Sequence, residues 1–248
     1  MSDHCQELVA KGDKDRFLSC LFAPREARPH LFALYAFNVE IARIRETVSE
    51  PQIGLVRQQW WLDTIDEIYA GRTPDHPVAQ ALTQAIAKGD LPKHALHNLI
   101  IAREFDLYDD PVATLSDLEG YLGETSSSLI QMAALILGKG AAEAAGLAGV
   151  AFGLTGVVRL QKPRYLPRDM VQSHGQKGTI NQLCAHARRR LNEARALLSS
   201  IPAQALPAFL PASLTELYLK RIERGSAHEV SQFRRQITLW RAARNNRF

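Results

Sequence analysis

The sequence predicts an all-α protein. Apolar residues recur with helical spacing along the whole chain, and no alternating β-branched runs are bounded by turn residues. Proline and glycine stand where helices begin and end. With 248 residues, of which 46% are hydrophobic, the chain can bury a large core. We therefore expect one helical domain without a sheet and without internal repeats.

Several expected helices have a local reason to begin or end where they do. Pro24 suits the first turn of a helix, because proline lacks the amide hydrogen that the first turn leaves unused. Gly71 and Gly89 suit the ends of the second and third helices. In chain order we expect helices over Pro24–Glu46, Ile53–Ala70, His76–Lys88, Pro92–Tyr108, Thr114–Gly138, Gly140–Leu160, Lys177–Ser200, Ala212–Arg224 and Glu229–Asn245.

Two local signals divide the chain further. Thr114 and Asp117 have the spacing of a capping box in its acidic variant, so a helix should begin there. Pro202, Pro207 and Pro211 indicate the only obvious linker. We therefore expect a main domain over residues 1–201 and a C-terminal helical cap over 202–248, both parts of one domain.

Composition limits where the protein works. The first 14 residues are charged and do not resemble a secretory signal, and the longest uncharged stretch, Ala144–Val158, is too short to span a bilayer. Cys5, Cys20 and Cys184 are few and odd in number, which favours a reducing compartment over a disulfide framework. We expect a soluble or peripheral protein.

The C-terminal tail carries the excess positive charge. The residues from Arg221 onwards have a balance of +5 in a chain whose net charge is +4. Val230, Phe233, Ile237 and Trp240 form one apolar stripe of the last helix, which we expect to pack against the core. The arginines that would then face a membrane or a partner are Arg234, Arg235, Arg241 and Arg244.

The run Leu34–Glu46, with Phe17–Pro24 before it and Trp60–Val78 after it, resembles the first half of a squalene/phytoene synthase. That family carries the motif D-D-x-x-D one turn beyond Tyr-Ala-Phe, where it holds magnesium against a prenyl diphosphate. Here the motif positions are Ala42, Arg43 and Glu46. Magnesium prefers oxygen ligands, so alanine offers nothing and arginine repels the ion.

The second aspartate motif of that family is altered as well. Its glutamine, asparagine and aspartate correspond to Gly153, Gly156 and Leu160, whereas Arg159 and the run Arg164–Pro167 are retained. The resemblance is nearest to the branch of the complex I assembly factor of squalene/phytoene-synthase type. The segments that suggest this branch are Ala36–Glu40, Asp117–Tyr121, Ser126–Leu129 and Tyr165–Pro167.

The resemblance implies an isoprenoid-synthase-like helical bundle around a central cavity, with the two altered motifs facing each other. Candidate residues for binding a substrate or an anion there are Tyr35, Arg43, Arg45, Glu46, Arg159, Lys162, Arg164 and Tyr165. Candidates for lining the cavity are Val39, Ala42, Gly149, Gly153, Gly156 and Leu160. The arginines could instead pair with Glu40, Glu46 and other nearby acids, and the glycines could instead serve close helix packing.

Three functional hypotheses follow. The first is a non-catalytic protein that acts as an assembly or scaffolding factor for a membrane respiratory complex of the complex I type. It would have no catalytic residues and no cofactor. The second is an active prenyl transferase with an atypical magnesium site that includes Glu46. The third is a module that binds an isoprenoid or an anionic lipid. We expect a cytoplasmic or matrix-side protein peripheral to the inner membrane, a respiratory-complex subunit or assembly protein as partner, and no nucleic-acid partner.

Overall fold

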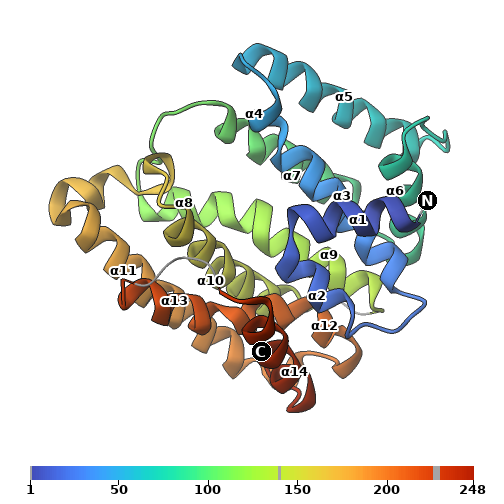
Figure 1. The fold of residues 1–248 in the computed structure, drawn as a ribbon. Helices are drawn as coiled ribbons and strands as arrows, with labels where there is room; N and C mark the ends of the chain where they lie inside the picture. Colours follow the sequence, from blue (N-terminus) through green and yellow to red (C-terminus); the bar gives the residue numbers. More distant parts are fainter. Residues whose placement is uncertain (1, 139–140, 226–229) are drawn as a thin grey trace. The chain divides into compact units, whose positions relative to one another are not determined.

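The computed structural model describes residues 2–138, 141–225 and 230–248, and every regular element within these ranges is a helix (Figure 1). The prediction of an all-α protein is confirmed. The chain divides into two compact units. Unit 1 comprises Met1–Asp109 and Leu135–Lys139, and unit 2 comprises Asp110–Ala134 and Gly140–Phe248.

In unit 1, helix α3 forms the centre, and α1 and α6 pack against it. Nine consecutive residues of α3, from Leu31 to Val39, are buried. A Cβ atom on Gly12 would lie 2.6 Å from Val39 Cγ1, so glycine allows α1 to approach α3 closely. The helices of unit 1 are α1 (Ser2–Gly12), α2 (Lys14–Cys20), α3 (Arg28–Ala42), α4 (Ile44–Thr47), α5 (Pro51–Tyr69), α6 (Pro77–Gly89), α7 (Lys93–Ala102) and the 3₁₀ helix η1 (Arg103–Leu107).

In unit 2, helix α10 is central, and α11, α13 and a π-helical turn pack against it. Gly175 has φ of 66° and interrupts α11, where only glycine adopts such a backbone at no cost. The longer helices are α8 (Leu115–Leu122), the π turn η2 (Gly123–Ser127), α9 (Ser128–Ile136, whose end belongs to unit 1), α10 (Ala142–Leu160), α11 (Arg168–Ala196), α13 (Thr215–Glu223) and α14 (Gln232–Arg244). The short ones are η3 (Pro163–Tyr165), η4 (Leu198–Ser200), η5 (Ala203–Ala205), α12 (Leu206–Phe209) and η6 (Leu210–Leu214).

The predicted helix boundaries are right in part. The capping box is confirmed, because the Asp117 amide donates to Thr114 Oγ1 at 3.2 Å and the Thr114 amide donates to the Asp117 carboxylate at 3.0 Å. The helix expected from Pro24 begins at Arg28 instead, because residues 24–27 form turns. It also breaks at Arg43, so the altered first motif spans the end of α3 and the start of α4.

The linker expected around Pro202–Pro211 is wrong. Residues 203–214 form a series of short helices, and Leu206, Phe209 and Leu210 are buried. Pro207 and Pro211 stand in the first turns of two of these helices, so the prolines begin helices here. The division into residues 1–201 and a cap over 202–248 stays a prediction.

The prediction that the apolar stripe of α14 packs inward is also wrong in large part. Val230 is buried, but Phe233 is 68% exposed and Trp240 is 51% exposed. The side of α14 that is buried carries Leu239, Ala242 and Arg235, which lie about half a turn away from the stripe. Arg235, expected to face a membrane or partner, is therefore buried at 9% exposure.

Among the described residues, α10 alone is long and apolar enough for its length and composition to suit a membrane span. Half of the 18-residue window that passes this test is buried within the protein. A core helix of a soluble protein has the same properties, so this is weak evidence for a span.

Candidate functional site

The retained tyrosine of the first motif lies inside the core of unit 1. Tyr35 is buried, and the guanidinium carbon of Arg16 lies 5.6 Å from the centre of its ring. Arg16 in turn donates to the Asp13 carboxylate at 2.6 Å. Burial raises the pKa of Tyr35, so this hydroxyl stays protonated. Val39 is buried beside it on α3, where it contacts α1 at Gly12.

The altered first motif has no ligand set for magnesium. Ala42 is half-buried, and Arg43 and Glu46 are exposed, with Arg43 Nε lying 3.9 Å from Glu46 Oε2. Arg45 Nη2 lies 3.7 Å from Asp109 Oδ2. In neither unit do three described His, Cys, Asp or Glu side chains gather as a metal would require. A single carboxylate with a cation beside it does not fit magnesium.

The four glycines of α10 have two different roles. A Cβ atom on Gly149 would lie 2.2 Å from Ser127 Cα, and one on Gly153 would lie 2.6 Å from Leu122 Cδ2. These two glycines let the π turn and the end of α8 pack against α10, which is the close-packing alternative. That they also line a cavity stays a prediction. Gly146 and Gly156 have no atom within 4 Å of the added Cβ among the described residues.

The second altered motif ends at the surface of unit 2. Leu160, which replaces the family's aspartate, is 58% exposed. The guanidinium carbon of Arg159 lies 3.8 Å from the centre of the Tyr218 ring, which is a close cation–π contact. The carbonyl oxygen of Arg164 accepts a hydrogen bond from the Val112 amide at 2.8 Å.

The remaining candidates of this motif lie near the 3₁₀ turn η3. Lys162 is exposed. The ring of Tyr165 lies 5.9 Å from that of Tyr121. In unit 1 the structure thus pairs Arg43 with Glu46, and Arg45 with Asp109. In unit 2, Arg159 meets Tyr218 and Tyr165 meets Tyr121. That the candidates of the two motifs converge on one cavity stays a prediction.

Sequence patterns did not reveal an ionic network in unit 2. The Glu119 carboxylate accepts two hydrogen bonds from Arg190, at 2.7 and 2.9 Å, and lies 2.6 Å from His186 Nε2. Burial opposes ionisation of Glu119, but the hydrogen bonds from Arg190 and His186 outweigh it and hold the pKa of this carboxyl below its ordinary value. The network ties α8 to α11, whose residues are about seventy positions apart in the chain.

A pocket in unit 1 was missed as well. It has a volume of about 290 Å³ and lies between the end of α3, α4, α5 and the residue before α6. Its lining comprises Glu40, Arg43, Ile44, Thr47, Arg57, Trp60, Trp61 and His76. The adjacent tryptophans were the available sequence signal, but the contribution of His76 depends on tertiary packing.

The sequence and the fold are similar to those of known proteins. The family model described as squalene/phytoene synthase matches residues 9–241. Two solved structures share the fold. A dehydrosqualene synthase, at 17% sequence identity, has a TM-score of 0.81 over 98% of this chain and 95% of that chain. Squalene synthase HpnC from Alicyclobacillus acidocaldarius, at 20% identity, has a TM-score of 0.78 over 90% of this chain and 93% of that chain.

Curated relatives are more similar in sequence. The chain is 35% identical over 243 residues to NADH dehydrogenase (ubiquinone) complex I, assembly factor 6 of Bos taurus, covering 89% of this chain and 73% of the relative. It is 34% identical over 247 residues to the Homo sapiens protein of the same name, covering 90% of this chain and 74% of the relative. The expected isoprenoid-synthase-like fold is confirmed.

Proposed function

The chain belongs to the squalene/phytoene synthase family, and from that premise we propose that it is a non-catalytic member that helps to assemble a membrane respiratory complex of the complex I type. The observation that carries this proposal is its similarity to complex I assembly factor 6. Two such proteins are 34–35% identical to it across about nine tenths of its length.

The motif positions support the non-catalytic part of the proposal. Ionising a prenyl diphosphate requires stabilisation of a large developing charge, which metal ions commonly provide. Ala42 and Arg43 replace carboxylates in unit 1, and the exposed Leu160 replaces one in unit 2. No resident cofactor is therefore part of this proposal.

The assembly role can be tested in human cells that lack their own assembly factor 6. The chain, preceded by a mitochondrial leader peptide, should restore assembled complex I, measured by native electrophoresis with an in-gel NADH dehydrogenase stain. The human factor in the same vector is the positive control. Glu46→Gln should rescue equally, because the proposal assigns no catalysis to that carboxylate. Failure of rescue by imported, folded chain would contradict the proposal.

An active prenyl transferase is the second candidate function, favoured by the retained Tyr35, Arg159 and Tyr165. The non-catalytic proposal expects no diphosphate release from farnesyl or geranylgeranyl diphosphate with Mg²⁺ or Mn²⁺. Steady release that Glu46→Gln abolishes would establish the transferase, with magnesium at an atypical site. If the transferase were established in this way, rescue of complex I by Glu46→Gln would show whether assembly depends on catalysis.

We also propose that the protein works at the surface of the inner membrane, on the matrix or cytoplasmic side. The outward side of α14 supports this. It carries the exposed Phe233 and Trp240 together with three exposed arginines, Arg234, Arg241 and Arg244. Aromatic side chains favour the membrane–water interface, and arginines are attracted to anionic lipid headgroups.

Binding of an isoprenoid or phospholipid in a cavity between the motifs is a separate proposal, tested by native mass spectrometry of the purified chain.

A further inference from the structure

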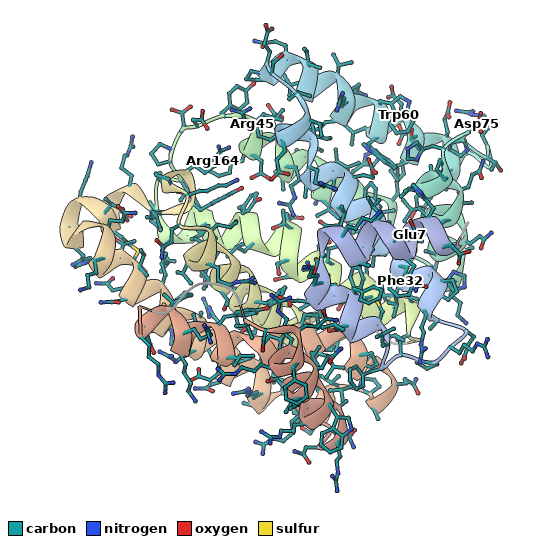
Figure 2. The ribbon with its side chains drawn as sticks, viewed as in Figure 1. Glu7, Phe32, Arg45, Trp60, Asp75 and Arg164 are labelled. Atoms are coloured by element: carbon teal, nitrogen blue, oxygen red, sulfur yellow. The ribbon has the colours of Figure 1, made fainter. Side chains whose placement is uncertain are left out.

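One wall of the pocket in unit 1 is aromatic. The rings of Trp60 and Trp61 meet edge to face with centroids 4.9 Å apart, and both lie 5.3 Å from the His76 ring. The centre of the Phe37 ring on α3 lies 5.1 Å from the centre of the Trp61 ring. Trp61 is buried, whereas Trp60 is 45% exposed. Figure 2 labels Trp60 on α5. The wall therefore offers flat apolar surface at the mouth of the pocket.

The charged residues of the pocket favour an anion. Its lining includes two guanidinium groups, from Arg43 and Arg57, against one carboxylate, from Glu40, and Arg43 Nε also lies 3.9 Å from Glu46 Oε2 outside the lining. Arg57 Nη1 donates to Thr47 Oγ1 at 2.6 Å, and Arg57 forms no ion pair within 4.0 Å with any residue of the described ranges. Its remaining donors match the oxygens of a phosphate or carboxylate group.

One polar atom of the lining lacks a partner. Nδ1 of His76 is shielded from solvent and makes no hydrogen bond to another described residue. A buried polar atom without a partner costs free energy, so this edge of the His76 ring is held at a cost by the packing around it. Outside the pocket, Ile53 and Val56 are exposed and share a face of α5 with Trp60, so apolar surface continues beyond the mouth.

We propose that this pocket binds a small organic anion, consisting of one phosphate or carboxylate group on a flat apolar body. Arg57 and Arg43 hold the anionic group, and Trp60 packs against the body. The volume of about 290 Å³ lies at the lower end for ligand sites, which limits the occupant to a small molecule. This proposal does not rest on the assembly role, because it is argued from the residues of the pocket alone.

Tryptophan fluorescence can test this site directly. The chain has three tryptophans, so Trp240→Phe leaves only the two that line the pocket. In this background, excited at 295 nm, phenyl phosphate should quench the fluorescence saturably. Benzyl alcohol, which lacks the charge, and inorganic phosphate, which lacks the ring, should each bind at least about tenfold more weakly.

One variant and a matched control decide the role of Arg57. Arg57→Gln should weaken phenyl phosphate binding by about tenfold or more, whereas Arg25→Gln, an exposed arginine of the same unit outside the lining, should leave it unchanged. Melting curves check that both variants fold. The proposal is overturned if phenyl phosphate gives no saturable quenching, if either comparison probe binds as tightly, or if Arg57→Gln binds like the parent. None of these outcomes bears on complex I rescue.

Discussion

Helices α10 and α14 carry the same kind of sequence signal and use it in opposite ways. Each has a stripe of residues at helical spacing, glycines in α10 and large apolar residues in α14. In α10, Gly149 and Gly153 of that stripe meet neighbouring backbone and side chains inside unit 2. In α14, Phe233 and Trp240 lie at the surface while Leu239 is buried. A stripe thus marks a specialised side of a helix, but not which side meets the core.

The side of a helix that is buried depends on what its neighbours can accommodate. Helix α14 packs against the compact turn η6, whose residues are all buried. Against such a surface the helix presents Leu239 and the small Ala242, and keeps its aromatic residues outside. The aromatic side of α14 therefore faces away from the core of its own unit.

The test with the largest expected effect replaces one residue on each side of α14 by alanine, in separate variants. Leu239→Ala should lower the free energy of unfolding by about 2–5 kcal/mol, because it leaves a cavity where a fully buried side chain packs. Phe233→Ala should change it by less than about 0.5 kcal/mol, because that ring is largely in solvent. Urea titration of both variants measures the difference. A larger loss for Phe233→Ala would reverse the assignment of the two sides.

The next test concerns the two kinds of glycine in α10. Gly149→Ala should destabilise the protein by about 1–3 kcal/mol, because its Cβ would overlap the backbone of Ser127. Gly156→Ala, where the added methyl has no atom of a packing neighbour within 4 Å among the described residues, should stabilise it by up to about 1 kcal/mol through helix propensity. Thermal unfolding of the matched pair is the measurement. Equal effects would mean that the stripe has one role along its whole length.

Much of the fold could be predicted from the sequence because its signals are local. The Thr114–Asp117 capping box depends on residues three positions apart, and it was found at its predicted place. The break of α3 at Arg43 and the π turn Gly123–Ser127 carry no such signal. The Pro202–Pro211 segment misled the prediction because a proline suits a loop and the first turn of a helix equally well.

The site was predictable where it depended on motif positions and not where it depended on packing. Substitutions at Ala42 and Leu160 are visible in the chain itself. The contact of Arg159 with Tyr218, 59 positions later, depends on how α10 and α13 pack. The pocket likewise needs His76 to meet Trp60 and Trp61, a contact that periodicity does not encode.

The smallest expected effect concerns the outward side of α14 and a lipid surface. The purified chain should bind vesicles that contain anionic lipid, and the binding should weaken as salt screens the arginines. Arg241→Gln should reduce the affinity by about 1 kcal/mol, roughly fivefold, because each basic residue near such a surface contributes about that much. Arg25→Gln, exposed but in unit 1, is the matched control and should leave the affinity unchanged. The headgroups of neutral vesicles attract no cation, so Arg241→Gln should have no effect on binding to them. Trp240→Ala should still weaken binding to neutral vesicles, because its exposed ring suits the membrane–water interface. Co-sedimentation measures all of these affinities. Equal binding of wild type and Arg241→Gln to anionic vesicles, or no binding to any vesicle, would assign this side of α14 to a protein partner instead.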